Sequence, residues 1–221
     1  MTTFALVGAG PGLGLACARR FGAAGHTVAL LARNAEHLDS HVAELGRDGI
    51  QARGYTADVL GPDSLTTALR RAGEELGPVE ILQFSPVPRA DFMKPVLDTG
   101  PADLDDPLGF SIKGPLTCVN AVLPGMRAMG RGTLLFVNGG SAVRPHPDRA
   151  GTSIAFAGAS AYAAMLHDAL ADENIHAAQL IVPGAISPGS ERSSPNVLAE
   201  RLYALHTDRD GFRHYAEPMP A

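Results

Sequence analysis

The sequence predicts a single α/β domain in which a Rossmann-like, doubly wound parallel sheet extends over residues 1–221. Three observations predict this fold. Short apolar segments alternate with helical segments, which is typical of a parallel sheet with helices on both faces. A glycine-rich turn separates the first apolar segment from the first helical one. The 221 residues contain no internal repeat and no linker, and this length suits one α/β domain.

Six strands are predicted where short apolar runs end at glycine, proline or polar turn residues. They cover Thr3–Val7, His26–Leu31, Ile50–Thr56, Glu80–Phe84, Thr133–Asn138 and His176–Val182. The predicted helices cover Leu13–Ala24, 34–48, Ser64–Leu76, Asp103–Met129, Ile154–Glu173 and Pro195–His206. Asn34 is suited to cap the second helix, and Gly114-Pro115 is expected to interrupt the fourth. Residues 85–101 and 139–153 are expected to be loops, and the C-terminal part 185–221 is expected to form a cap on the substrate side.

Composition and charge exclude several classes of protein. The net charge is −5 and the basic residues are scattered, so neither a nucleic-acid partner nor a membrane surface is expected. We find no apolar run approaching the roughly 18 residues needed to span a bilayer. Cys17 and Cys118 are expected to be free buried thiols, and without a secretory signal the expected location is the cytoplasm. Histidines and carboxylates show no metal-ligand spacing, so no metal site is expected.

The glycines after the first strand predict a dinucleotide site. Gly8, Gly12 and Gly14 form the pattern G-x-x-x-G-x-G, and Leu13 begins the helix. Such a turn lets the backbone approach a pyrophosphate and directs a helix N-terminus at its negative charge. The alternative interpretation is a merely tight turn, but the strand–turn–helix context favours a cofactor.

The end of the second strand predicts which cofactor binds. NAD-selective sites usually place a carboxylate here for the ribose 2′-OH, whereas this chain has Ala32 followed by Arg33 and Asn34. A guanidinium suits a 2′-phosphate, and no carboxylate repels it. We therefore expect NADP(H), with a solvated residue at a helix start as the alternative for Arg33.

Taken in order, these residues resemble the short-chain dehydrogenase/reductase family, and the resemblance covers nearly the whole chain. Val7 stands where many members have Thr. The resemblance implies that Asp58-Val59 contacts the adenine and that Pro183-Gly184 lines the nicotinamide. Gln83-Phe84-Ser85-Pro86 replaces the usual Asn-Asn-Ala-Gly, which assigns Ser85 to the cofactor site. The two long helices would form a homodimer or a homotetramer, as family members commonly do.

The catalytic motif of the family is altered. Its Tyr-x-x-x-Lys places both side chains on one helix face, where Lys lowers the pKa of Tyr. None of the four tyrosines here has Lys four residues later. Counting back from Pro183-Gly184 places Phe156 at the Tyr position and Ser160 at the Lys position. Ser141 falls near the catalytic Ser of the family, and Ser111 falls near its Asn.

Two other side chains are candidates for the proton donor. His146 lies with Asp148 and Arg149 in the loop that borders the active cleft in the family, and histidine titrates near neutrality. The alternative for His146 is an exposed loop residue. Tyr162 lies two positions past Ser160 and so faces another side of the helix, where a packing or interface role is expected.

Three functions remain open. The first is an NADP(H)-dependent oxidoreductase that acts on a small carbonyl or enone, with Ser141 binding the oxygen and with water, substrate or His146 supplying the proton. The second is an inactive NADP(H)-binding sensor or scaffold. The third is a non-redox enzyme, such as a dehydratase or cyclase, in the same cleft. Analogy of fold favours the first.

Overall fold

A seven-stranded sheet, all parallel, forms the centre of the computed structural model, which describes residues 1–219. The strand order is β3-β2-β1-β4-β5-β6-β7. The strands are β1 (Thr3–Val7), β2 (Thr27–Ala32), β3 (Ala52–Thr56), β4 (Val79–Phe84), β5 (Gly132–Gly139), β6 (Ile175–Val182) and β7 (Arg213–Tyr215). The strand order reverses beside β1, so the carboxyl ends of β1 and β4 border the crevice where open α/β sheets bind ligands.

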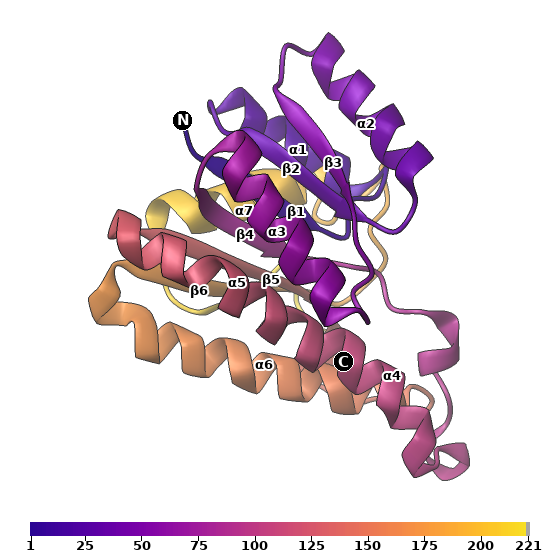
Figure 1. Cartoon of the computed structure of the whole chain (residues 1–221). Helices are drawn as coiled ribbons and strands as arrows, with labels where there is room; N and C mark the ends of the chain where they lie inside the picture. Colours follow the sequence, from indigo (N-terminus) through magenta and orange to yellow (C-terminus); the bar gives the residue numbers. More distant parts are fainter. Residues whose placement is uncertain (220–221) are drawn as a thin grey trace.

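Helices cover both faces of this sheet (Figure 1). One face carries α1 (Leu13–Ala23), α2 (Ala35–Arg47) and α7 (Pro195–Asp208). The other face carries α3 (Pro62–Leu76), α5 (Gly114–Met129) and α6 (Ala150–Leu170). The short α4 (Asp105–Leu108) precedes α5. This arrangement confirms the predicted doubly wound α/β fold.

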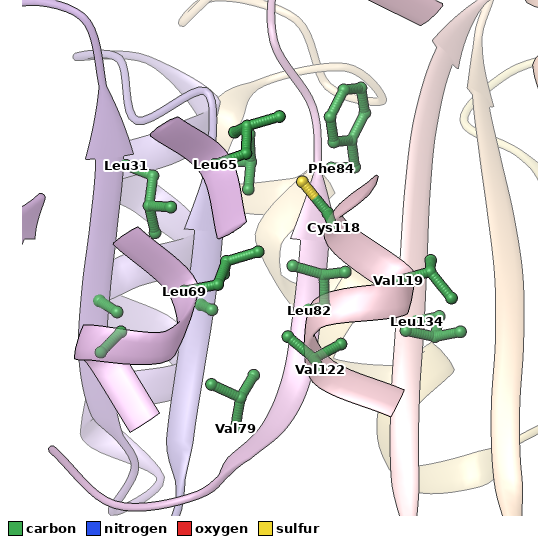
Figure 2. Close-up of a cluster of buried hydrophobic side chains, with 14 of the residues drawn as sticks. Leu31, Leu65, Leu69, Val79, Leu82, Phe84, Cys118, Val119, Val122 and Leu134 are labelled. Carbon is green, nitrogen blue, oxygen red and sulfur yellow. The ribbon is translucent and has the colours of Figure 1, made fainter. Parts of the chain in front are cut away.

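A continuous apolar core fills the space between the sheet and the second helical layer. Figure 2 shows Leu31, Leu82 and Leu134 on the strands, which face Leu69 on α3 and Val122 on α5. Each of these side chains is buried. Because strands of a parallel sheet are buried on both faces, they appear in the sequence as nearly continuous apolar runs.

Several element boundaries differ from the predicted ones, for local reasons. β3 begins at Ala52 because the N–H of Ile50 bonds to the carbonyl of Leu45 and closes α2. α3 begins at Pro62, in the first turn, where proline's missing N–H costs nothing. α6 begins at Ala150 rather than at Ile154. The predicted interruption near Gly114-Pro115 is a π-helical turn over Gly109–Lys113.

The C-terminal region contains a strand that the sequence did not predict. β7 pairs with β6 at the edge of the sheet, although residues after 206 were expected to form only a tail. α7 packs against α1. The final described residues lie near the carboxyl ends of the strands, where Met219 packs against Ala142, Phe156 and Ile181. The cap over the substrate side stays a prediction.

The segment Ala150–Glu173 corrects one expectation from the sequence. Within residues 1–219 it is the one helix long and apolar enough to cross a membrane by length and composition alone, whereas no such segment was expected. A helix packed on a protein core meets the same test. Here α6 packs against β6, and Ala155, Ala159 and Ala163 are among its buried residues.

Candidate cofactor cleft and active site

The turn after β1 is built around Gly8. Its φ is +95°, which side chains rarely adopt, and a Cβ there would lie 2.6 Å from the Cα of Pro86. The N–H groups of Gly8 and Ala9 both bond to the carbonyl of Leu31, at 3.0 and 3.1 Å. This closely packed turn directs the chain into α1.

The other glycines of the turn have different roles. A Cβ on Gly14 would lie 3.3 Å from the carbonyl oxygen of Gly8, so Gly14 allows helix and strand to approach. A Cβ on Gly10 or Gly12 would meet nothing within 4 Å, so both face open space. Gly12 is the N-cap of α1 and Leu13 its first residue, with no side chain capping the helix. The open space and the uncapped helix N-terminus fit a bound pyrophosphate.

A cleft of about 890 Å³ opens beside this turn, between the carboxyl ends of β1, β2 and β4. Five of the predicted cofactor residues line it, namely Gly8, Arg33, Asn34, Asp58 and Val59. The other predicted cofactor residues are not among its lining: Gly12, Leu13, Gly14, Ser85, Pro183 and Gly184. The sequence did not single out His37 and Arg89, which also line the cleft.

Local hydrogen bonds fix several side chains of the cleft. The side chain of Asn34 accepts a bond from the N–H of His37 at 3.0 Å and so caps α2, as predicted. Asp58 accepts from the N–H of Leu60 at 3.0 Å. Arg89 is paired with Asp91 and Asp106. Arg33 is exposed at the start of the turn into α2, where its guanidinium can reach a ligand in the cleft.

A second cluster brings together residues expected near the reacting atoms. Ser141 lies in a 3₁₀ turn, Gly140–Ala142, directly after β5. Ala142 packs in a small cluster with Phe156, whose side chain is buried. A Cβ on Gly140 would lie 3.3 Å from the Cα of Pro183. The turn of Ser141, the ring of Phe156 and Pro183 therefore border one region.

The tail adds two residues to this region that the sequence did not suggest. A Cβ on Gly184 would lie 2.9 Å from Oε1 of Glu217, and one on Gly140 would lie 3.2 Å from the terminal methyl of Met219. Both contacts join segments far apart in the sequence, and no periodicity marks the tail. Sequence reasoning therefore had no signal for them.

The two alternative proton donors have other contacts. The Nδ1 atom of His146 accepts from the N–H of Asp148 at 3.2 Å, and its loop is bonded to Lys94 and Val96. The ring is exposed. Tyr162 packs against the core beside Cys118, and burial raises the pKa of its phenol to about 12. Tyr162 thus has the packing role expected from its helix face.

A cavity of about 10 Å³ is lined in part by Phe156. Its polar lining comes from Ser111 in the π-helical turn and from Asn138 on β5. Pro86 and Phe110 line both this cavity and the large cleft, so the two adjoin. A space of this size holds one water-sized atom.

Ser160, one helical turn after Phe156 on α6, belongs to a polar network. Its hydroxyl is buried and lies 2.9 Å from Oε1 of Gln179 on β6 and 2.8 Å from a terminal nitrogen of Arg213 on β7. Gln179 also donates to Asn138 at 2.9 Å. Among residues 1–219, no three histidine, cysteine or acidic side chains gather into a possible metal site.

Sheet order and glycine turn together define a Rossmann-like α/β protein with its crevice at β1 and β4. The short chain dehydrogenase family matches residues 2–196, and the chain belongs to this family. A short chain dehydrogenase of Pseudocercospora fijiensis is 29% identical over 195 residues, which are 86% of this chain and 60% of that protein. The chain spans less than two thirds of the length of the first curated relatives that it matches.

Solved structures share the whole fold. A short-chain dehydrogenase from Rhodopseudomonas palustris has a TM-score of 0.87 at 24% identity, with 98% of both chains covered. A short chain oxidoreductase from Pseudomonas aeruginosa PAO1, described as NADPH-bound and as containing an atypical catalytic center, has a TM-score of 0.87 at 18% identity. The match covers 100% of this chain and 97% of the P. aeruginosa chain. At such identities the likeness concerns the fold.

Proposed function

We propose that this chain is an NADP(H)-dependent oxidoreductase that acts on a small carbonyl or enone without the usual Tyr and Lys. The cleft beside Gly8 supports the proposal, because Arg33 lines it, a guanidinium suits a 2′-phosphate, and no carboxylate stands at Ala32. The NADPH-bound oxidoreductase of P. aeruginosa, with its atypical center, supports this proposal by analogy. The nicotinamide supplies the hydride or takes it up.

The cofactor residues divide into three groups. Gly8, Gly12, Leu13 and Gly14 form the turn and helix start around the pyrophosphate. Arg33 and Asn34 bind the adenosine 2′-phosphate end, and Asp58 and Val59 border the adenine. Ser85, Pro183 and Gly184 contact the nicotinamide end.

At the reacting end the chain contributes Ser141 and Phe156. The hydroxyl of Ser141 donates a hydrogen bond to the substrate oxygen, and the ring of Phe156 excludes water. The proton comes from water, from the substrate or from His146. Because Nδ1 of His146 already accepts a bond from the N–H of Asp148, water or the substrate is favoured as the proton source. Loss of a positioned acid costs about 10²–10⁴-fold in rate, so turnover of plain ketones is expected to be slow.

A non-catalytic NADP(H)-binding sensor is the second candidate. The bonds of Ser160 to Gln179 and Arg213 favour it, because a hydroxyl held in this way does not replace the lysine that lowers the pKa of the catalytic Tyr in the family. A dehydratase or cyclase in the same cleft is the third.

Two measurements on the purified protein separate these functions. Calorimetric titration with NADPH and NADH is expected to show binding, with tighter binding of NADPH. NADPH oxidation is then followed against a panel of small ketones, enones and quinones. Binding without any NADPH oxidation would favour the sensor or the non-redox enzyme, and the absence of binding would contradict the proposal.

A further inference from the structure

A continuous chain of polar contacts joins the edge of the sheet to the small cavity. Arg213 on β7 stands in register with Gln179 on β6. Nε of Arg213 donates to Oε1 of Gln179 at 3.0 Å, and a terminal nitrogen donates to Ser160 at 2.8 Å. Nε2 of Gln179 donates to Oδ1 of Asn138 at 2.9 Å. Asn138 lines the cavity together with Ser111 and Phe156.

The direction of every bond in this chain follows from Arg213. A guanidinium can only donate, so the atom of Gln179 that faces it must be the oxygen. The amide nitrogen of Gln179 then faces Asn138, which must accept through its own oxygen. Consequently Nδ2 of Asn138 is the other terminal atom of its amide, and within residues 1–219 its N–H bonds have no acceptor. One donor at the edge of the sheet thereby sets the orientation of two amides.

The cavity that Asn138 lines is suited to hold an acceptor for this N–H group. Its walls are mainly aromatic rings and prolines, from Phe84, Phe110, Phe136, Phe156, Pro86 and Pro115. In such apolar surroundings a hydrogen bond is stronger than in water. The volume of about 10 Å³ admits one oxygen-sized atom and not a whole substrate.

We propose that Asn138 donates a hydrogen bond to an acceptor oxygen beside Phe156, and that Gln179 and Arg213 are positioning residues that fix this donor. The inference rests on the proposed oxidoreductase function. The oxygen belongs either to the substrate carbonyl or to a bound water. Both present the same acceptor chemistry.

Four variants test the proposal kinetically. Asn138→Asp keeps the shape but removes the donor, and kcat/KM is expected to fall about 10²-fold, as when one oxyanion donor is lost. Arg213→Met frees both amides to rotate and is expected to lower kcat/KM about tenfold, because only part of the molecules then present a donor. Because both act through one amide, Asn138→Asp with Arg213→Met should be no slower than Asn138→Asp alone. Arg209→Met is the matched control, since Arg209 bonds instead to Asn174 and Gly132, and is expected to keep kcat/KM.

A second measurement does not depend on turnover. The chain contains only three glutamines and five asparagines, so their side-chain amide signals can be assigned by substitution in ¹⁵N-labelled protein. Arg213→Met is expected to shift the Gln179 and Asn138 signals and to speed their hydrogen exchange, while Arg209→Met leaves both unchanged. NADPH affinity should stay within about twofold in all variants, which separates loss of the donor from loss of the cofactor.

The outcomes separate the two proposals. If the wild type turns over nothing while Arg213→Met still alters the Asn138 amide, the oxidoreductase fails and the positioning network stands. Unchanged amide signals in Arg213→Met, or unchanged kcat/KM in Asn138→Asp, would overturn the inference. Crystals with a carbonyl analogue identify the oxygen. If the acceptor is a bound water, a water stays in the cavity; if it is the substrate carbonyl, the carbonyl oxygen of the analogue occupies the cavity.

Discussion

Gly8 and Pro86 approach so closely that a Cβ on Gly8 would overlap the Pro86 backbone, with 2.6 Å to its Cα. Gly8→Ala is therefore expected to lower the free energy of unfolding by at least about 2 kcal/mol, since the left-handed backbone alone costs an alanine roughly 1–2 kcal/mol. Urea unfolding measures the change. Gly10→Ala is the matched control, because its Cβ meets nothing within 4 Å. Equal stability of the two variants would contradict the assigned packing.

Arg33 is expected to determine the choice of cofactor. Arg33→Asp should weaken NADPH binding roughly 10- to 100-fold, the value of about 1.5–3 kcal/mol for a hydrogen bond to a charged group. It should also favour NADH, because a carboxylate can accept from the ribose 2′-OH. Arg47→Asp, at the C-terminal end of α2, serves as control. Calorimetry with both cofactors gives the answer, and unchanged selectivity would remove Arg33 from the site.

Restoring the family motif is expected to need both of its residues. Phe156→Tyr alone supplies a phenol but no lysine to lower its pKa, since the guanidinium of Arg213 is bonded to Ser160 and Gln179. Ser160→Lys alone supplies no acid. The double variant should gain more ketone reduction than the two single variants combined. It should also unfold more readily, since the introduced ammonium would meet the guanidinium of Arg213, now 2.8 Å from the Ser160 hydroxyl. Rapid turnover of a plain ketone by the wild type would show that the catalytic acid lies elsewhere.

An oligomer is expected to form through α5 and α6, as a homodimer or homotetramer. These helices expose Leu116, Ile154 and Met165, with exposed fractions of 40%, 46% and 62%. Exposed apolar patches are typical of interaction sites, and these three side chains are the candidates for such a patch on α5 and α6. Ile154→Lys with Met165→Lys should shift the protein toward the monomer in analytical ultracentrifugation. A wild-type protein that sediments as a monomer at every concentration would refute the expectation.

Stability is expected to decrease between neutral and acid pH because of His176 and His206. Burial lowers the pKa of both rings to about 4. The folded state thus favours the neutral ring, so its contribution is complete above the ordinary histidine pKa of about 6.5 and is lost as the pH falls toward 4. Thermal unfolding from pH 7 to pH 4.5 should show the decrease. His176→Asn should flatten the curve, whereas the exposed His146→Asn should leave it unchanged.

The sequence predicts an element correctly where the physical cause of that element is local. Six strands follow from apolar runs, and the turn at Gly8 follows from its place between a strand and a helix. β7 has no such signal, because Arg213, His214 and Tyr215 are largely exposed and only their pairing with β6 makes them a strand. The start of α6 at Ala150 likewise depends on a distant contact, the bond from its N–H to the carbonyl of Lys94.

The same distinction between local and distant causes applies to the candidate site. The cofactor cleft is predictable because Gly8, Arg33 and Asp58 each follow a strand, and parallel strands place such residues at one edge. The network of Asn138, Gln179 and Arg213 is not predictable, because it depends on the register of three strands. The sequence shows that the lysine of the family motif is absent but not which side chains fill the surroundings of Ser160.

The position of Arg213 on β7 has a consequence for the timing of any reaction. β7 is the shortest strand, and in the described sheet it is paired only with β6. Edge segments of this kind open at a lower free energy than central strands. Each opening would release Gln179 and let the Asn138 amide turn over. Molecules whose last strand is docked would then present the donor more often than the others, so a contact at the periphery would influence the rate at the centre.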